Sequence, residues 1–240
     1  MKIKTFYINM KKDKKRNKET IHELRKTNLS YKRFPGYDGS MIDKKKLLQN
    51  NRFSNFSILF NSNKMIGCSY SHIQLYKYIQ TLDIDYALIL EDDIVVLNPD
   101  LDYTKEVTNI ILKYNFLNPR WKIIRLHSMC FDLGSAAAYI VSKEKIDELS
   151  NMKLYYHIDV QQSFQYNIIN LNKLFSTKDK EIHYKNPFLN IFIQNQKIGF
   201  YLYQNCFSIL NKTIYGYDVF YFFIMTISYI AIRKPKISFL

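Results

Sequence analysis

Apolar runs alternate with amphipathic segments along most of the chain. Continuous apolar runs are typical of strands covered on both faces, whereas apolar spacings of three and four residues indicate helices. The strands predicted in this way are 3–10, 31–40, 86–90 with a short continuation over 93–97, 121–127 and 136–141. The predicted helices lie within 11–27, over 65–82, 101–115 and 143–152, and in the second part of 155–171.

Because predicted strands alternate with predicted helices, the pattern favours an α/β fold with a mostly parallel sheet. Two segments depart from it. Residues 41–64 are polar and irregular, which predicts a mobile loop. Residues 219–232 are uncharged, apolar and aromatic. We therefore expect a main domain over 1–200 and a hydrophobic, helical C-terminal tail over 201–240.

The apolar run of the tail is shorter than the about 20 residues that a membrane-spanning helix needs. Three basic residues, Arg233, Lys234 and Lys236, follow it. Residues 214–240 therefore fit a peripheral membrane contact whose basic flank faces lipid phosphates. The alternative is a terminal helix buried in the core.

The net charge of +14 is uneven, because residues 1–50 hold 15 Lys and Arg against 5 Asp and Glu. A basic surface favours anionic partners, such as nucleic acid, phosphorylated sugars or an anionic membrane. A solvated face is the alternative. Cys68, Cys130 and Cys206 lie far apart and show no metal spacing, which favours a reducing, cytosolic setting. The N-terminus does not have the order of a secretory signal.

Three acids, Glu91, Asp92 and Asp93, follow the apolar strand 86–90. In open α/β sheets, ligands bind beyond the carboxyl ends of the strands. Adjacent carboxylates repel one another unless a cation neutralises them, and oxygen ligands favour Mg²⁺ or Mn²⁺. The pattern predicts a metal–diphosphate site, and its alternative is an acidic surface turn.

Ser71 and His72 belong to the predicted helix 65–82. If they occupy its first turn, backbone N–H groups there favour a bound anion. The alternative for His72 is a buried structural histidine.

Five segments of the chain resemble glycosyltransferase family 25 in order and rough spacing, over about residues 2–190. The family comprises lipooligosaccharide galactosyl- and glucosyltransferases, and the collagen galactosyltransferases are related to it. The Gly-Cys-x-x-Ser-His and Glu-Asp-Asp elements are together the most specific. The matching segments read FYINMKKDKKR, FPGYDGS, GCSYSHIQLYKYI, YALILEDDI and SAAAYIVSKEKIDEL.

The resemblance implies a GT-A type fold and a UDP-hexose donor, usually UDP-galactose. It implies that Glu91, Asp92 and Asp93 hold Mn²⁺ or Mg²⁺ against the diphosphate, with Asp93 as the main ligand. Asn9, Arg16 and Asp38 match other family elements and are expected at the nucleotide-sugar site. Ser71 and His72 are expected at the same site because of the anion-binding helix turn described above. The chain departs from the family at Met10, Tyr37 and His157.

Two further residues receive catalytic or metal roles as hypotheses. Asp159 is the candidate base for the acceptor hydroxyl, and its alternative role is to cap a helix that starts near Gln161. His183 is a candidate fourth metal ligand, and its alternative is a surface histidine.

The predicted function is metal-dependent transfer of a hexose, with galactose favoured, to a sugar hydroxyl of a growing glycan such as lipooligosaccharide. We expect a lipid-linked acceptor at the cytosolic face of the inner membrane, and no nucleic acid partner. One alternative is a metal-dependent phosphoesterase or nuclease that uses the same acids. A second alternative is a non-catalytic, membrane-associated scaffold.

Overall fold

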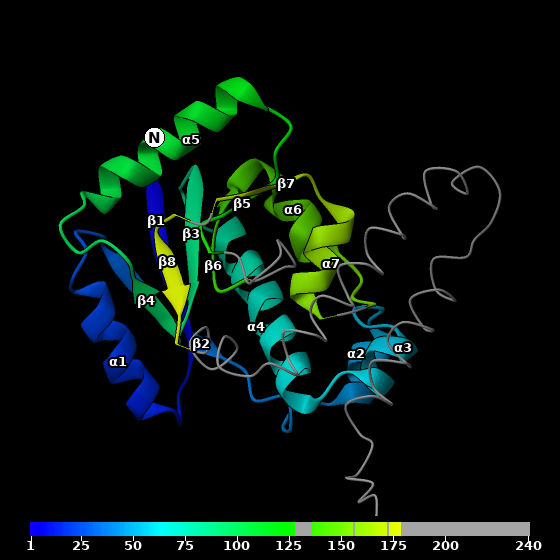
Figure 1. Cartoon of the computed structure of the whole chain (residues 1–240). Helices are drawn as coiled ribbons and strands as arrows, with labels where there is room; N and C mark the ends of the chain where they lie inside the picture. The colour runs from blue at the N-terminus through cyan, green and yellow to red at the C-terminus, as the bar shows by residue number, and fades with distance from the viewer. Residues whose placement is uncertain (128–135, 156, 172, 179–240) are drawn as a thin grey trace, which may run out of the picture. The chain divides into compact units, whose positions relative to one another are not determined.

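The computed structural model describes residues 1–127, 136–155, 157–171 and 173–178 (Figure 1). Its strands are β1 (Ile3–Met10), β2 (Tyr31–Gly36), β3 (Tyr86–Glu91), β4 (Ile94–Val96), β5 (Ile123–Arg125), β6 (Ala138–Ser142), β7 (Ile168–Asn170) and β8 (Phe175–Thr177). Its helices are α1 (Lys14–Leu24), α2 (Lys44–Gln49), α3 (Asn55–Phe60), α4 (Asn63–Gln80), α5 (Tyr103–Leu117), α6 (Lys143–Asn151) and α7 (Ile158–Gln165).

Six strands form the main sheet in the order β2-β1-β3-β6-β5-β7. Every neighbouring pair is parallel except the two that involve β6, which runs against the others. The predicted α/β fold with a mostly parallel sheet is therefore confirmed. The strand β4 does not continue β3 as predicted, because it pairs with β8 in a separate two-stranded sheet.

Side chains that alternate along the central strands enter two different cores. Phe6 and Ile89 pack in the core that contains α4 and α6, whereas Tyr7 and Leu88 pack in the core of α1 and α5. Figure 1 shows α4, α6 and α7 on one side of the sheet and α1 and α5 on the other. Burial on both faces explains why the strands of this sheet read as continuous apolar runs.

The predicted mobile loop over 41–64 is wrong, because this segment contains α2 and α3. Their N-caps explain the helices locally: Asp43 accepts hydrogen bonds from the N–H groups of Lys45 and Lys46, and Ser54 accepts one from Ser57. Both helices have six residues, and so short a helix shows too little apolar periodicity to be recognised in a sequence.

Helix α4 begins earlier than the sequence predicts. Ser62 caps it by accepting a hydrogen bond from the N–H group of Met65, so the helix starts at Asn63. Ser71 and His72 consequently lie in the third turn, where the backbone N–H groups are already bonded within the helix. The expected anion site at these two residues is therefore wrong as a helix N-terminus.

Other predicted boundaries change in smaller ways. Ser142 occupies the N-cap position of α6, but its side chain makes no capping hydrogen bond. The helix predicted in the second part of 155–171 lies earlier, as α7, and Ile168–Asn170 form the strand β7 instead. The strands β7 and β8 were not predicted, because three-residue strands give almost no alternation to detect.

Several predicted features lie outside the described residues, including Cys130, Cys206, His183 and the tail over 201–240 with its proposed membrane contact. Within the residues that the structure describes, no helix is long and apolar enough to cross a bilayer.

The loop after β2 touches helix α4 through two glycines. A Cβ atom on Gly39 would lie 1.7 Å from the carbonyl oxygen of Asn63, and one on Gly67 would lie 2.6 Å from the carbonyl oxygen of Tyr37. Ser71 joins the same two segments, because its hydroxyl accepts from the N–H group of Tyr37 at 2.8 Å and donates to the carbonyl of Gly67 at 2.6 Å. The backbones can therefore approach this closely only where side chains are absent.

We expect Gly67→Ala to lower the free energy of unfolding by about 1–3 kcal/mol, because the added methyl group meets backbone atoms that cannot rotate away. The same change in an unobstructed helix interior would stabilise by up to about 1 kcal/mol. Urea denaturation measures the difference. Gly36→Ala is the control, since its nearest contact would be 3.2 Å, and its loss should be smaller. A Gly67→Ala variant as stable as the wild type would contradict the close contact.

Candidate functional site

A pocket of about 610 Å³ opens at the carboxyl ends of β1, β2 and β3. Its wall includes the turn after β1, the start of α1, the loop after β2, one face of α4 and the residues that end β3. This is the edge at which open α/β sheets bind ligands. The residues predicted from sequence that line this pocket are Asn9, Arg16, Asp38, Ser71, His72, Glu91 and Asp92.

One part of the wall is built around Asp92. The guanidinium of Arg16 donates to Oδ1 at 2.9 Å, and Nδ2 of Asn9 donates to Oδ2 at 2.7 Å. The hydroxyl of Thr20 donates to the backbone carbonyl of Asp92 at 2.9 Å. Burial opposes the charge of Arg16, but the hydrogen bond with Asp92 raises the pKa of the guanidinium. Asn9 and Arg16, which the family resemblance places at the nucleotide, therefore bind the carboxylate of Asp92, which the resemblance places at the metal.

Asn9 carries a buried acceptor that has no donor among the described residues. The residue is 1% exposed, and its Oδ1 accepts no hydrogen bond from the described residues. A buried amide oxygen without a donor is costly, and such atoms often mark a missing ligand or water. Since Asn9 lines the pocket, a bound N–H or O–H group would satisfy this oxygen.

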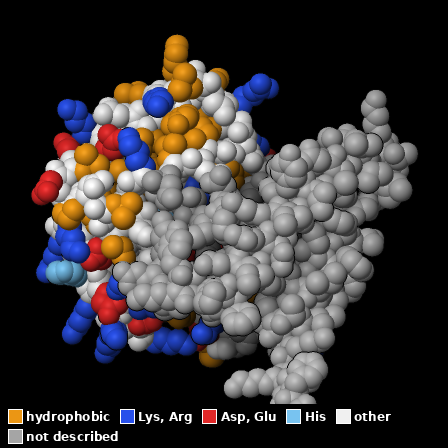
Figure 2. Space-filling view, in the orientation of Figure 1, with side chains coloured by type: hydrophobic (Ala, Val, Ile, Leu, Met, Phe, Trp, Pro, Cys, Tyr) orange, Lys and Arg blue, Asp and Glu red, His pale blue; other side chains and the backbone are white. Residues whose placement is uncertain are grey.

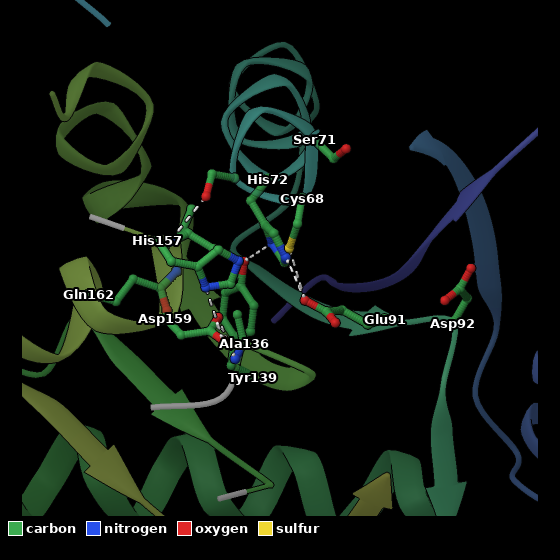
Figure 3. A network of polar contacts seen from close by, with 12 residues as sticks. Cys68, Ser71, His72, Glu91, Asp92, Ala136, Tyr139, His157, Asp159 and Gln162 are labelled. Carbon is green, nitrogen blue, oxygen red and sulfur yellow. Dashed lines mark hydrogen bonds and ion pairs between the residues drawn. The ribbon is translucent and has the colours of Figure 1, made fainter. Parts of the chain in front are cut away.

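Glu91 turns to the opposite side, toward α4 (Figure 3). Its Oε1 lies 3.1 Å from Nε2 of His72 and 3.5 Å from Sγ of Cys68. Burial, and then the charge of Glu91, raises the pKa of the Cys68 thiol well above its usual value, so the thiol stays protonated and donates. His72 is fully buried, and its Nδ1 contacts the hydroxyl of Tyr139 at 2.7 Å.

The three adjacent acids do not converge on one point. Within the described residues, the one group of three potential ligands whose atoms lie within 4.8 Å of one another is Cys68, His72 and Glu91. Asp93 does not line the pocket, although the sequence favoured it as the main metal ligand. The reason is the turn between β3 and β4, which sends successive side chains in different directions.

Asp38 stands on the loop after β2, at the opposite wall of the pocket from β3. Hydrogen bonds from Lys12 and from the hydroxyl and N–H groups of Ser40 lower the pKa of its carboxyl group to about 2. The acid is therefore ionised across the physiological range, and it holds the loop as well as facing the pocket.

Asp159 lies outside the pocket lining, in the first turn of α7. Its Oδ1 accepts from the N–H group of Ala136 at 3.0 Å, and its Oδ2 lies 3.4 Å from Nδ1 of His157. The alternative that Asp159 caps a helix starting near Gln161 is wrong, because α7 begins at Ile158 and the N-cap position belongs to His157. Burial opposes ionisation of Asp159, but the charge of His157 lowers its pKa.

The sequence missed several residues of the site. Cys68 precedes His72 by four residues, a spacing that puts both side chains on one face of a helix, so this pair was detectable. Thr20 and Tyr139 were not detectable, because only the fold brings them to Asp92 and His72.

The contact between His157 and Asp159 should make the stability of the fold depend on pH. Burial lowers the pKa of His157, but the charge of Asp159 overcomes this and raises it. A group with a raised pKa in the folded state adds stability below its unfolded value of about 6.5, and this stability is lost as the pH rises through the folded value.

We therefore expect Asp159→Asn to lower the pKa of His157 and to remove stability at pH 5 to 6 more than at pH 8. NMR titration of the His157 ring and urea denaturation at each pH measure both effects. Asp100→Asn, a change of an exposed acid, is the control. An unchanged His157 titration in Asp159→Asn would rule out the ion pair.

Solved structures resemble this chain weakly. A glycosyltransferase involved in glycosylation of the major capsid of PBCV-1 is 12% identical with a TM-score of 0.39, and the match covers 71% of this chain and 81% of that one. A mutant Drosophila β-1,4-galactosyltransferase 7 in complex with manganese, UDP-Gal and xylobiose is 11% identical with a TM-score of 0.43, over 78% and 74%. The galactosyltransferase LgtC, with donor and acceptor sugar analogues, is 10% identical with a TM-score of 0.39, over 70% and 72%.

No curated protein sequence matches this chain. All three TM-scores are below 0.5, so the assignment of the chain rests on its own sequence. The model of glycosyltransferase family 25, described as an LPS biosynthesis protein, matches residues 2–134, which is more than half of the chain. This range contains every residue that lines the pocket. The chain therefore belongs to glycosyltransferase family 25, and it is an enzyme of the glycosyltransferase class.

Proposed function

We propose that the protein transfers a hexose, with galactose favoured, from a UDP-sugar to a hydroxyl group of a growing surface glycan. In this proposal the donor binds in the pocket at the ends of β1, β2 and β3, in the manner of GT-A enzymes. The observation that supports this proposal is the placement of Glu91 and Asp92 in the wall of that pocket beside the buried, unsatisfied oxygen of Asn9.

The charges of the wall call for a cation when a diphosphate binds. Its basic residues are Lys12, Arg16 and Lys64, and its acidic residues are Asp13, Asp38, Glu91 and Asp92. Three positive and four negative side chains leave a formal charge of −1. A wall of this charge would repel a diphosphate, and a divalent cation between the two would remove the repulsion.

Glu91 and Asp92 each keep acceptor capacity for such a cation, although their carboxylates are held by different elements. Within the described residues, Oε2 of Glu91 accepts no hydrogen bond, and each oxygen of Asp92 accepts one while carrying two lone pairs. Carboxylate oxygens are the ligands that Mg²⁺ and Mn²⁺ prefer. A bound ion would act as a Lewis acid toward the departing diphosphate. Asn9 would accept from an N–H or O–H group of the nucleotide.

The basic N-terminal region does not form an unbroken cationic surface. Arg16 pairs with Asp92, Lys26 with Glu23, and Lys2 with Asp83. On the face shown in Figure 2, lysine and arginine side chains stand beside acidic ones. The paired charges favour a small anionic ligand inside the pocket over a nucleic acid on the surface.

The roles of Asp159 as base and His183 as ligand stay predictions. Both oxygens of Asp159 are already engaged by Ala136 and His157, which supports a structural role in joining α7 to the start of β6. A lipid-linked acceptor and a peripheral membrane contact through residues 214–240 also stay predictions.

The described residues hold one three-ligand group, whereas two-metal phosphoesterases need paired acid-rich sites, so the geometry favours sugar transfer over phosphate hydrolysis.

We expect Mn²⁺-dependent binding of UDP-galactose to the wild type, and its loss by about tenfold or more in Glu91→Gln and in Asp92→Asn. Removing either charge takes away a ligand of the cation while keeping the shape of the side chain. Isothermal titration calorimetry with UDP-galactose and UDP-glucose, each with and without Mn²⁺ or Mg²⁺, measures the affinities and compares the two sugars.

Asp93→Asn is the matched control, because it removes the same charge one residue farther along the chain, outside the pocket lining. Its effect should be smaller than that of Asp92→Asn. Absence of metal-dependent UDP-sugar binding by the folded wild type would overturn the proposal. A larger loss in Asp93→Asn than in Glu91→Gln and Asp92→Asn would return the metal site to the arrangement predicted from sequence.

A further inference from the structure

A chain of polar contacts links Glu91 to a buried arginine on the far side of α4. Nε2 of His72 contacts Glu91 at 3.1 Å, and Nδ1 of His72 contacts the Tyr139 hydroxyl at 2.7 Å. The hydroxyls of Tyr139 and Tyr76 lie 2.6 Å apart. Figure 3 shows His72, Tyr139 and Gln162 grouped between α4 and α7.

The other end of the chain of contacts is Gln162 on α7. Its Nε2 lies 2.7 Å from the Tyr76 hydroxyl, and its Oε1 lies 3.3 Å from a guanidinium nitrogen of Arg125. All of these side chains except Glu91 are buried: Arg125, Gln162, Tyr76, Tyr139 and His72.

Arg125 at one end and the Glu91 carboxylate at the other set the direction of the hydrogen bonds between them. An arginine only donates, so the amide atom of Gln162 that faces it is the oxygen. The amide nitrogen of Gln162 therefore faces Tyr76 and donates to its hydroxyl oxygen. Tyr76 has one proton, and the acceptor left for it within hydrogen-bond distance is Tyr139. The proton of Tyr139 is then directed at Nδ1 of His72.

The two tyrosines can pass on this direction because they keep their protons. Burial raises the pKa of Tyr76 and of Tyr139 above the usual value. A proton on Nδ1 would meet the proton of Tyr139. The contacts therefore leave the ring proton of His72 on Nε2, where it donates to Glu91.

We call the hydrogen bonds from Arg125 through Gln162, Tyr76 and Tyr139 to His72 the relay. We propose that the relay fixes His72 as the Nε2–H tautomer and thereby holds Oε1 of Glu91. Gln162, Tyr76 and Tyr139 are then positioning residues for this carboxylate. The oxygen that remains, Oε2, is the one left for a ligand. The tautomer follows from the contacts alone, whereas its value for cation binding rests on the proposed function.

The relay also decides against one other use of the site. Cys68, His72 and Glu91 are close enough to hold a thiophilic ion such as Zn²⁺. Such an ion needs the lone pair of Nε2, and the relay places a proton there. Binding of such an ion would therefore have to move the ring proton to Nδ1, against the proton of Tyr139.

The first test is the protonation pattern of His72, measured by NMR on the full chain labelled with ¹⁵N-histidine, without metal or sugar donor. The His72→Gln variant identifies the signals of His72 among those of the 5 histidines. The expected result is a proton on Nε2 and none on Nδ1. A proton on Nδ1 of the wild type would overturn the proposal.

The second test reverses the relay. Gln162→Glu replaces the donor that faces Tyr76 with an acceptor, while the other oxygen still faces Arg125. Tyr76 would then donate to the new carboxylate, Tyr139 would donate to Tyr76, and Nδ1 of His72 would gain a proton.

Gln161→Glu is the matched control. It adds the same charge to the same helix at another buried glutamine, and it keeps the acceptor for the N–H group of Tyr155. The proton should stay on Nε2 of His72 in this control. The proposal fails if Gln161→Glu and Gln162→Glu change His72 alike, or if neither does.

If Gln162→Glu does not fold, Tyr76→Phe provides the reversal test. Removing this hydroxyl takes away the donor that Tyr139 accepts from, so Tyr139 can accept from Nδ1 of His72. We expect a proton on Nδ1 in part of the molecules, while Glu91 keeps the proton on Nε2. A Tyr76→Phe variant with the wild-type tautomer alone would overturn the relay.

Calorimetry separates this inference from the proposed function. If both hold, Gln162→Glu weakens Mn²⁺-dependent UDP-galactose binding by about tenfold, as second-shell changes at metal sites do, and Gln161→Glu leaves it unchanged. If the wild type binds no UDP-sugar but shows the expected tautomers, the proposed function fails and the relay stands. If the sugar donor binds but the tautomer is reversed, the relay fails alone.

Discussion

The contact between helix α4 and the loop after β2 is the constraint on which the pocket depends. Gly39 and Gly67 let the two backbones meet at a distance that a Cβ atom would prevent. One turn farther along α4, this contact fixes Ser71 and His72, and the residue after Gly67 is Cys68. The wall of the pocket is therefore set by backbone packing, and the polar groups are placed on it.

The two acids at the end of β3 are held by different partners. Asp92 is held by Arg16 and Asn9 from α1 and β1, whereas Glu91 accepts from Cys68 and His72 on α4. Separating the two carboxylates onto different partners lowers their mutual repulsion before any ligand binds. It also leaves each acid with unused capacity to accept.

The order of the sheet joins the pocket to a distant part of the fold. The antiparallel strand β6 lies between β3 and β5, so Tyr139 on β6 stands between His72 and the end of β5. Arg125 at the end of β5 is 1% exposed, and burial lowers its pKa. Hydrogen bonds to Gln162 and to the backbone carbonyl of Asp159 compensate for part of this cost.

Much of the architecture follows from local sequence. The strands β1 and β3 and the helices α4 and α5 are long, with strong apolar patterns, and each lies close to its predicted position. Adjacent acids after a buried strand located the pocket edge. The family resemblance assigned five of the residues that line the pocket, namely Asn9, Arg16, Asp38, Glu91 and Asp92. The short elements α2, α3, β7 and β8 were missed because three to six residues give too little periodicity.

The sequence by itself determined the fold class, the family and the edge of the sheet where chemistry takes place, because these depend on local patterns and on motifs a few residues long. Only the tertiary structure decided that Glu91 faces His72 while Asp92 faces Arg16, and that Asp93 leaves the pocket. It alone showed the hydrogen-bonded chain from Arg125 to Glu91. These contacts join residues that are distant in the sequence, and their direction depends on which atoms the packing brings within hydrogen-bond distance.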